Sequence, residues 1–425
     1  MLPAPLVVSA RLGKVDIDKT EARQFMTTHL SDRSEHPTQT WAYWNGVLAM
    51  TLCVFALVAS EFMPVSLLTP ISHDLGVSEG LAGQGIGISG ALAVLTSLSI
   101  SGLARNTDRK VLLLGLTLLM ALSGMIVAMA PDYLTYMVGR GLLGVAIGGF
   151  WSMSAATAIR LVPPPQVPQA LAIFNGGNAL AMVIAAPLGS YLGAVIGWRG
   201  AFFCLVLVAL IAFVWQCISL PAMAAERDGK RSGNILRLLN NPLVATGMAA
   251  CGIFFMGQFT LFTYVRPFLE TATHASIPTL SLTLLIIGVA GFIGTLLIGV
   301  FLRRGFYPTL IVIPLLMTAI AGMLIAFGYS IWIVMPLLGI WGLVATAAPV
   351  GWWTWVARTL PDDAEVGGGL MVAVIQLSIA LGSTLGGLAY DHSGYQSSFA
   401  ISGILLAIAA MLALLASRKD PKHNA

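Results

Sequence analysis

Charged side chains are nearly absent from a series of long apolar stretches in this 425-residue chain. A membrane-spanning helix needs about 20 apolar residues, because its length must match the hydrocarbon core of the bilayer. The stretches cover residues 44–68, 80–103, 111–130, 134–158, 169–192, 200–220, 242–265, 279–302, 308–328, 331–356, 366–389 and 396–416. They lack the polar and apolar alternation of barrel strands. The sequence therefore predicts an all-α membrane protein with twelve transmembrane helices.

The distribution of charge supports this prediction and gives an orientation. Only 9% of the residues are charged, whereas soluble domains carry about 25%. If the polar N-terminal tail is cytoplasmic, all 22 Lys and Arg residues except Arg140, Arg199 and Arg266 lie in that tail or in cytoplasmic segments. Basic residues collect on the cytoplasmic side of membrane proteins. We therefore expect a multi-pass protein with both termini in the cytoplasm.

Polar segments divide the chain into five parts. Residues 1–40 are predicted to be a disordered cytoplasmic tail, because no basic segment followed by an apolar core marks a signal peptide there. Residues 221–241 are polar and basic and are predicted to be a cytoplasmic linker. This linker separates two six-helix bundles, 41–220 and 242–416, and residues 417–425 form a second cytoplasmic tail.

The two predicted bundles repeat each other in sequence. Gly144 precedes Arg160 by 16 residues, as Gly342 precedes Arg358. The matching motifs that follow are GSYLG at 189–193 with GSTLG at 382–386, and GWRGAF at 197–202 with GYQSSF at 394–399. These matches pair helices four, five and six with ten, eleven and twelve, as expected for two pseudo-symmetric halves of a transporter.

Only Glu61 and Arg140 place a formal charge well inside an apolar stretch. Such a charge costs roughly 2.5 to 3.5 kcal/mol on insertion scales, so it usually has a function. Burial favours the neutral form of a carboxyl, which lets Glu61 bind and release a proton. Pro64 removes a backbone donor and loosens the helix nearby. The alternative is a structural glutamate that is hydrogen-bonded near the outer interface.

Arg140 shares one face of its predicted helix with Gly144, Ile147, Trp151 and Ser154. A face that combines a charge, small residues, an indole and a hydroxyl suits a cavity better than lipid. The alternative is that the arginine side chain extends to the outer interface. A pair between Glu61 and Arg140 stays open on sequence grounds.

Motifs in the first half resemble those of the major facilitator superfamily, in its drug:proton antiporter branch. RGLLG at 140–144 resembles the R-x-x-x-G motif of helix four, and APLG at 186–189, with Pro187 and Gly189, resembles the glycine-proline antiporter motif. Arg109 and Lys110 match the basic end of the gating loop between helices two and three, although Arg105 stands at its aspartate position. The resemblance implies a monomer that works by alternating access. It also makes Arg140 a proton relay or an interhelical hydrogen-bond partner.

Further stretches resemble bacterial purine ribonucleoside efflux pumps. They are residues 61–70, 148–155, 160–164, 262–267, 349–355 and 372–377. The resemblance implies a protein of the cell inner membrane that exports purine nucleosides such as inosine in exchange for protons. Its partners would be a nucleoside-like substrate, protons and the bilayer, without nucleic acid.

Flat purines favour aromatic walls and a few amide groups that recognise their edges. The residues that we expect to contact substrate are Trp151, Ser154, Gln258, Phe262, Trp352 and Gln376. Asn175 and Asn178 are weaker candidates. The alternatives are an aromatic belt at the membrane interface for the tryptophans and helix packing for the amides.

No nucleotide-binding loop, metal-ligand cluster or activated nucleophile is visible in the sequence, so we expect neither an enzyme nor a bound metal or cofactor. The four cysteines, Cys53, Cys204, Cys217 and Cys251, all lie in apolar stretches and are predicted to be packing residues. The alternative functions are proton-coupled efflux of sugars or drugs and, from another class, a membrane sensor or a channel.

Overall fold

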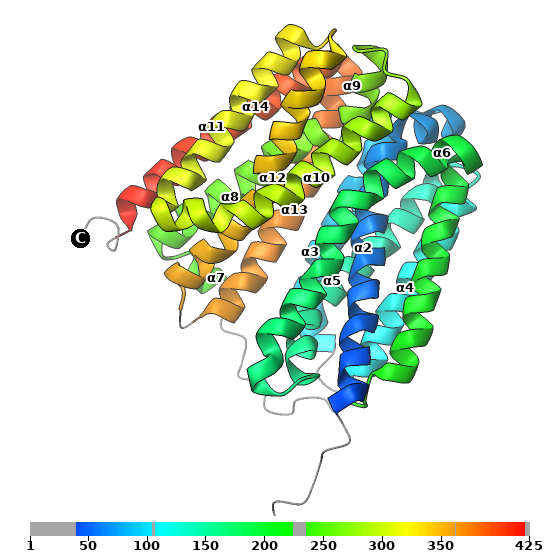
Figure 1. The fold of residues 1–425 in the computed structure, drawn as a ribbon, viewed down its shortest axis with the longest axis vertical. Helices are drawn as coiled ribbons and strands as arrows, with labels where there is room; N and C mark the ends of the chain where they lie inside the picture. Colours follow the sequence, from blue (N-terminus) through cyan, green and yellow to red (C-terminus); the bar gives the residue numbers. More distant parts are fainter. Residues whose placement is uncertain (1–39, 104–106, 224–234, 362, 421–425) are drawn as a thin grey trace, which may run out of the picture. The chain divides into compact units, whose positions relative to one another are not determined.

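The computed structural model describes residues 40–103, 107–223, 235–361 and 363–420. Most of these residues are helical (Figure 1). From residue 42 onward they belong to one compact unit. The predicted N-terminal tail lies outside the described residues up to residue 39, as do 224–234 of the predicted linker and 421–425 of the C-terminal tail.

The helices of the first half are α2 (Thr40–Leu75), α3 (Glu79–Leu103), α4 (Arg109–Ala128), α5 (Tyr133–Arg160) and α6 (Val167–Ser219), with a 3₁₀ turn at Pro164–Gln166 before α6. The short α7 (Ile235–Leu238) lies in the described part of the predicted linker. The helices of the second half are α8 (Pro242–Phe262), α9 (Val265–Thr271), α10 (Ile277–Arg304), α11 (Phe306–Phe327), α12 (Ile331–Thr359), α13 (Ala364–Ser393) and α14 (Tyr395–Lys419).

The number of membrane crossings follows from the lengths of these helices. The described residues contain ten helices that are long and apolar enough to cross a membrane. One of them, α6, has 53 residues and breaks at Gly197, so it provides two crossings. The 28-residue α5, which carries Arg140, has the length of one more crossing. Across the described residues, the prediction of an all-α protein with twelve transmembrane helices is confirmed.

Each half has its own apolar core. One cluster of buried side chains comes almost entirely from α2 to α6, and the other almost entirely from α8 to α14. Figure 1 shows the two bundles side by side, with the first in blue to green and the second in green to red. The exact limits of the bundles and of the linker stay a prediction.

Equivalent glycines make equivalent contacts in the two halves. Gly197 and Gly394 both have positive φ, 77° and 73°, which glycine adopts without steric cost. A Cβ on Gly144 would overlap the backbone of α3 at Ser89, and a Cβ on Gly342 would overlap the backbone of α10 at Ile287. The predicted internal duplication is therefore confirmed by backbone conformation and by packing.

The bundles meet where α3 packs on α13 and α6 packs on α10. One face of α3 carries a stripe of four glycines, at which an added Cβ would overlap residues of the second bundle: Gly80, Gly83, Gly87 and Gly90. Farther along this face Leu98 is 53% exposed. The bundles therefore join at the end where α3 begins and α13 ends. We call this the joined end.

Candidate functional site

Glu61 lies between the two bundles. It comes from α2 and is only 4% exposed. The side-chain amide of Gln376 on α13, also buried, donates to Glu61 Oε1 at 3.2 Å. Two predicted site residues, which are 315 positions apart, are thus brought into direct contact.

Arg140 is fully buried among helices of the first bundle. Its guanidinium donates to the main-chain carbonyls of Ser60 at 2.7 Å, Glu61 at 3.1 Å and Gly85 at 3.1 Å. The Ser60 carbonyl lacks its usual helical donor, because the residue four positions later is Pro64. Arg140 supplies the missing donor, as neighbouring helices commonly do at prolines in membranes. It is therefore an interhelical hydrogen-bond partner.

The pair left open by the sequence takes a different form. Arg140 binds the main-chain oxygen of Glu61, and the ion pairs formed by described residues do not include one between these two side chains. The Glu61 carboxylate faces Gln376 of the second bundle instead. Arg140 of α5 therefore binds the backbone of α2, while the Glu61 carboxylate beside it faces the second bundle.

An aromatic contact joins the bundles beside this carboxylate. Phe62 of α2 and Phe259 of α8 stack with ring centroids 5.6 Å apart, and Phe262 meets Phe259 edge to face at 6.1 Å. Gln258 is 9% exposed, and its Oε1 has no hydrogen-bond partner among the described residues. Phe262 and Gln258 thus lie on α8, the helix whose Phe259 ring stacks on Phe62, the residue that follows Glu61.

The remaining predicted substrate contacts lie elsewhere. Trp352 is buried in the core of the second bundle, where it packs edge to face on Trp355 at 6.3 Å. Trp151 is half-buried and packs on Phe174 at 6.4 Å within the first bundle. Ser154 is fully buried, and its hydroxyl has no partner among the described residues. Their role as ligand contacts stays a prediction.

The motif residues have structural partners in the first bundle and at the start of the predicted linker. Lys110 Nζ donates to the carbonyl of Cys217 at 3.0 Å, and the main-chain amide of Arg109 donates to the carbonyl of Met223 at 3.0 Å. A Cβ on Gly189 would overlap Ser66 Oγ on α2, which explains the small residue after Pro187. Arg105 lies outside the described residues.

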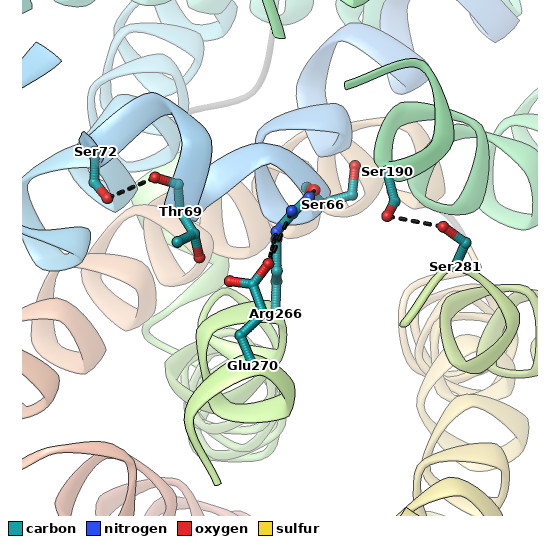
Figure 2. Close-up of polar contacts among 7 residues, drawn as sticks. All are labelled: Ser66, Thr69, Ser72, Ser190, Arg266, Glu270 and Ser281. Carbon is teal, nitrogen blue, oxygen red and sulfur yellow. Dashed lines mark hydrogen bonds and ion pairs between the residues drawn. The ribbon is translucent and has the colours of Figure 1, made fainter. Parts of the chain in front are cut away.

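Sequence reasoning missed a third buried charge. Arg266, which the sequence places at a helix end, is only 6% exposed. Its guanidinium donates to the main-chain carbonyl of Ser66 on α2 and pairs with Glu270 at 2.8 Å (Figure 2). The four-residue spacing of Arg266 and Glu270 on one helix is the signal that could have identified the ion pair.

Comparison with known proteins gives the family. The family model of the Major Facilitator Superfamily matches residues 50–371. "Transcription regulatory protein OpdE" of Pseudomonas aeruginosa is 61% identical over 397 residues, which cover 92% of this chain and 98% of that protein. "Purine ribonucleoside efflux pump NepI" is 40% identical in Escherichia coli K12, over 87% of this chain and 93% of that protein. In Salmonella enteritidis it is 39% identical, over 89% and 95%.

Solved structures share the fold at low sequence identity. A bacterial homolog of the human lysosomal transporter Spinster, inward-facing and unoccupied, has a TM-score of 0.75 at 17% identity, over 92% of this chain and 99% of that chain. The nucleoside transporter NupG, in a mutant form, has a TM-score of 0.72 at 11% identity, over 88% and 98%. The family model, the relatives and the fold agree: this multi-pass membrane protein belongs to the Major Facilitator Superfamily.

Proposed function

We propose that this transporter exports purine ribonucleosides in exchange for protons, with the Glu61 carboxyl as the proton-binding group. The substrate class is supported by the relatives at about 40% identity that are named purine ribonucleoside efflux pumps. The observation that carries the coupling is the buried hydrogen bond between Glu61 and Gln376, because it joins the two bundles.

Proton binding at Glu61 would favour burial of its side chain between the bundles. A charged carboxylate loses its hydration when it is buried, whereas a neutral carboxyl is buried at lower cost and still accepts the hydrogen bond from Gln376. Protonation therefore favours contact of α2 with α13, and deprotonation favours their separation. A group whose protonation states prefer different arrangements of the bundles shifts the conformational equilibrium.

The orientation predicted from the basic loops gives this cycle a direction. With both termini in the cytoplasm, the joined end faces outward and the opposite end faces the cytoplasm. A nucleoside then enters from the cytoplasm, and a proton that binds from outside favours the return step.

Gln258 and the phenylalanines supply groups suited to a purine. A buried amide oxygen without a partner carries a desolvation penalty, which an N–H of a bound base would relieve. Phe62, Phe259 and Phe262 offer ring faces and edges to a flat ligand. We therefore expect Gln258→Leu to raise the KM for inosine about tenfold while gradient coupling is kept.

The test is pH-gradient-driven uptake of radiolabelled inosine into inside-out vesicles. Glu61→Gln should reduce gradient-driven uptake at least about tenfold and retain inosine exchange without a gradient. Glu79→Gln, which alters a carboxyl at the first turn of α3, is the matched control and should transport normally. If Glu61→Gln keeps full gradient-driven uptake, Glu61 is not the coupling group.

A second candidate function comes from the relative named a transcription regulatory protein. A membrane exporter can change transcription by lowering the concentration of an inducer, without contacting nucleic acid. Vesicles that expel a sugar or chloramphenicol but not inosine would favour the other efflux substrates. Vesicles that transport none of them, from a protein whose loss alters transcription, would favour a sensor.

A further inference from the structure

Two backbone groups of the first bundle lack partners within their own helices at the joined end. The Ser66 carbonyl has no helical donor, because Pro70 stands four residues later. The amide of Gly80 lies in the first turn of α3, where backbone N–H groups have no intrahelical acceptor. Both groups receive a charged partner from the second bundle.

Arg266 is the partner of the Ser66 carbonyl. Arg266 lies on α9, and Glu270 one turn later accepts from its Nε at 2.8 Å. Figure 2 shows the guanidinium between Glu270 and α2. Glu270 thus orients a buried arginine toward the carbonyl that Pro70 leaves free. A second polar contact, between the hydroxyls of Ser190 and Ser281 at 2.9 Å, also joins the bundles (Figure 2).

Asp391 is the partner of the α3 terminus. Its Oδ1 accepts from the Gly80 amide at 2.9 Å, and its Oδ2 accepts from the Ser78 hydroxyl at 2.5 Å. A Cβ on Gly80 would overlap this carboxylate, so the glycine is what allows the approach. An aspartate from α13 therefore caps a helix of the other bundle.

We propose that Arg266 and Asp391 form a latch that holds the transporter closed at the joined end. Each side chain, from the second bundle, forms a hydrogen bond with a backbone group of the first bundle that has no partner within its own helix. When the bundles separate at this end, water can replace both partners, because the released groups then face solvent. The latch therefore stabilises the closed state without preventing opening.

The latch can be tested without substrate by measuring the distance between the bundles at this end. The exposed residues His73, in the last turn of α2, and Gln396, in the first turn of α14, would carry spin labels in a variant without native cysteines. Double electron–electron resonance in nanodiscs then reports the distribution of distances between the two spin labels. Arg266→Gln should increase the population open at this end about tenfold, since one charge-assisted bond is lost. Asp391→Asn should shift it in the same direction.

Arg199→Gln is the matched control. Arg199 is an arginine that donates to the Ala130 carbonyl and pairs with Asp74, but all three residues belong to the first bundle. We expect it to leave the distances unchanged. If Arg266→Gln and Asp391→Asn also leave them unchanged, the latch does not exist.

Pro70→Ala distinguishes loss of the latch from general destabilisation of the fold as the cause of a shift toward the open state. It returns an amide donor to Ser66, so it strengthens α2 while it reduces the need for Arg266. The latch predicts a smaller shift toward the open state, in the same direction as Arg266→Gln. A shift toward the closed state would overturn the proposal. Because no nucleoside or proton gradient is used, these results do not depend on the proposed substrate.

Discussion

Arg140 and Arg266 perform the same chemical task in two different settings. Each donates to a carbonyl of α2 that a proline leaves without a helical donor. Arg140 reaches Ser60 from within the first bundle, whereas Arg266 reaches Ser66 from the second. One kind of bond can therefore hold a bundle together or hold two bundles in one state. Which of these it does depends only on the helix that supplies the donor.

This difference predicts different consequences for substitution. Loss of a contact within a bundle leaves buried acceptors unpaired in every conformation, so it lowers the free energy of unfolding. Loss of a contact between bundles leaves its groups unpaired mainly in the closed state, so it shifts the population of states.

The largest effect is expected for Arg140→Leu. The substitution leaves the Ser60 carbonyl buried without a donor and removes charge-assisted bonds to Glu61 and Gly85. We expect the free energy of unfolding to fall by about 4 kcal/mol, since each orphaned buried acceptor costs about 1 to 3 kcal/mol. Unfolding in sodium dodecyl sulfate, followed by tryptophan fluorescence, measures the change.

A Pro64→Ala background sharpens this test. The backbone amide of the new alanine would donate to the Ser60 carbonyl, so Arg140→Leu should cost about 1 kcal/mol less there. Equal costs in both backgrounds would show that the Ser60 carbonyl is not what Arg140 stabilises.

An intermediate effect is expected for Gly144→Val. The new side chain would overlap the backbone of Ser89 within the first bundle, and overpacking costs about 2 kcal/mol of unfolding free energy. Gly90→Val is the matched change between the bundles, where a Cβ would lie 2.8 Å from the Gln376 carbonyl. Gly90→Val should open the joined end and leave stability nearly unchanged. Equal losses of stability in the two variants would contradict the distinction.

The smallest effect is expected for Lys110→Ala. Its ammonium donates to the Cys217 carbonyl in an exposed contact within the first bundle. Exposed polar contacts contribute little, because water replaces the partner, so the unfolding free energy should fall by less than about 1 kcal/mol. A loss as large as that of Gly144→Val would mean that burial does not set the scale of these effects.

The fold could be predicted because the lengths of the apolar stretches and the positions of the glycines are local features of the sequence. The thickness of the bilayer sets the length of the apolar stretches that form the long helices from α2 to α14. The match of Gly197 with Gly394 is visible without a structure. The two crossings of α6 are predicted as the separate stretches 169–192 and 200–220, and the structure adds that the helix continues between them except for the break at Gly197.

The site could be predicted only in part. A buried Glu61 is a visible anomaly, but its contact with Gln376 depends on how α2 meets α13, and no local pattern encodes that. Arg266 stands next to Pro267 at the end of an apolar stretch, and nothing in the local sequence indicates that its side chain is buried. It is buried because α9 packs against α2 of the other bundle, so its position is a tertiary property.

The glycine stripe on α3 has a mechanical consequence. Surfaces covered by large side chains interlock, and they must change rotamers in concert before they can part. The face from Gly80 to Gly90 has no side chains that interlock with the second bundle, so the bundles can part and meet again without repacking. The rate of each turnover would then depend on the few polar bonds beside this glycine stripe and little on changes of side-chain rotamer.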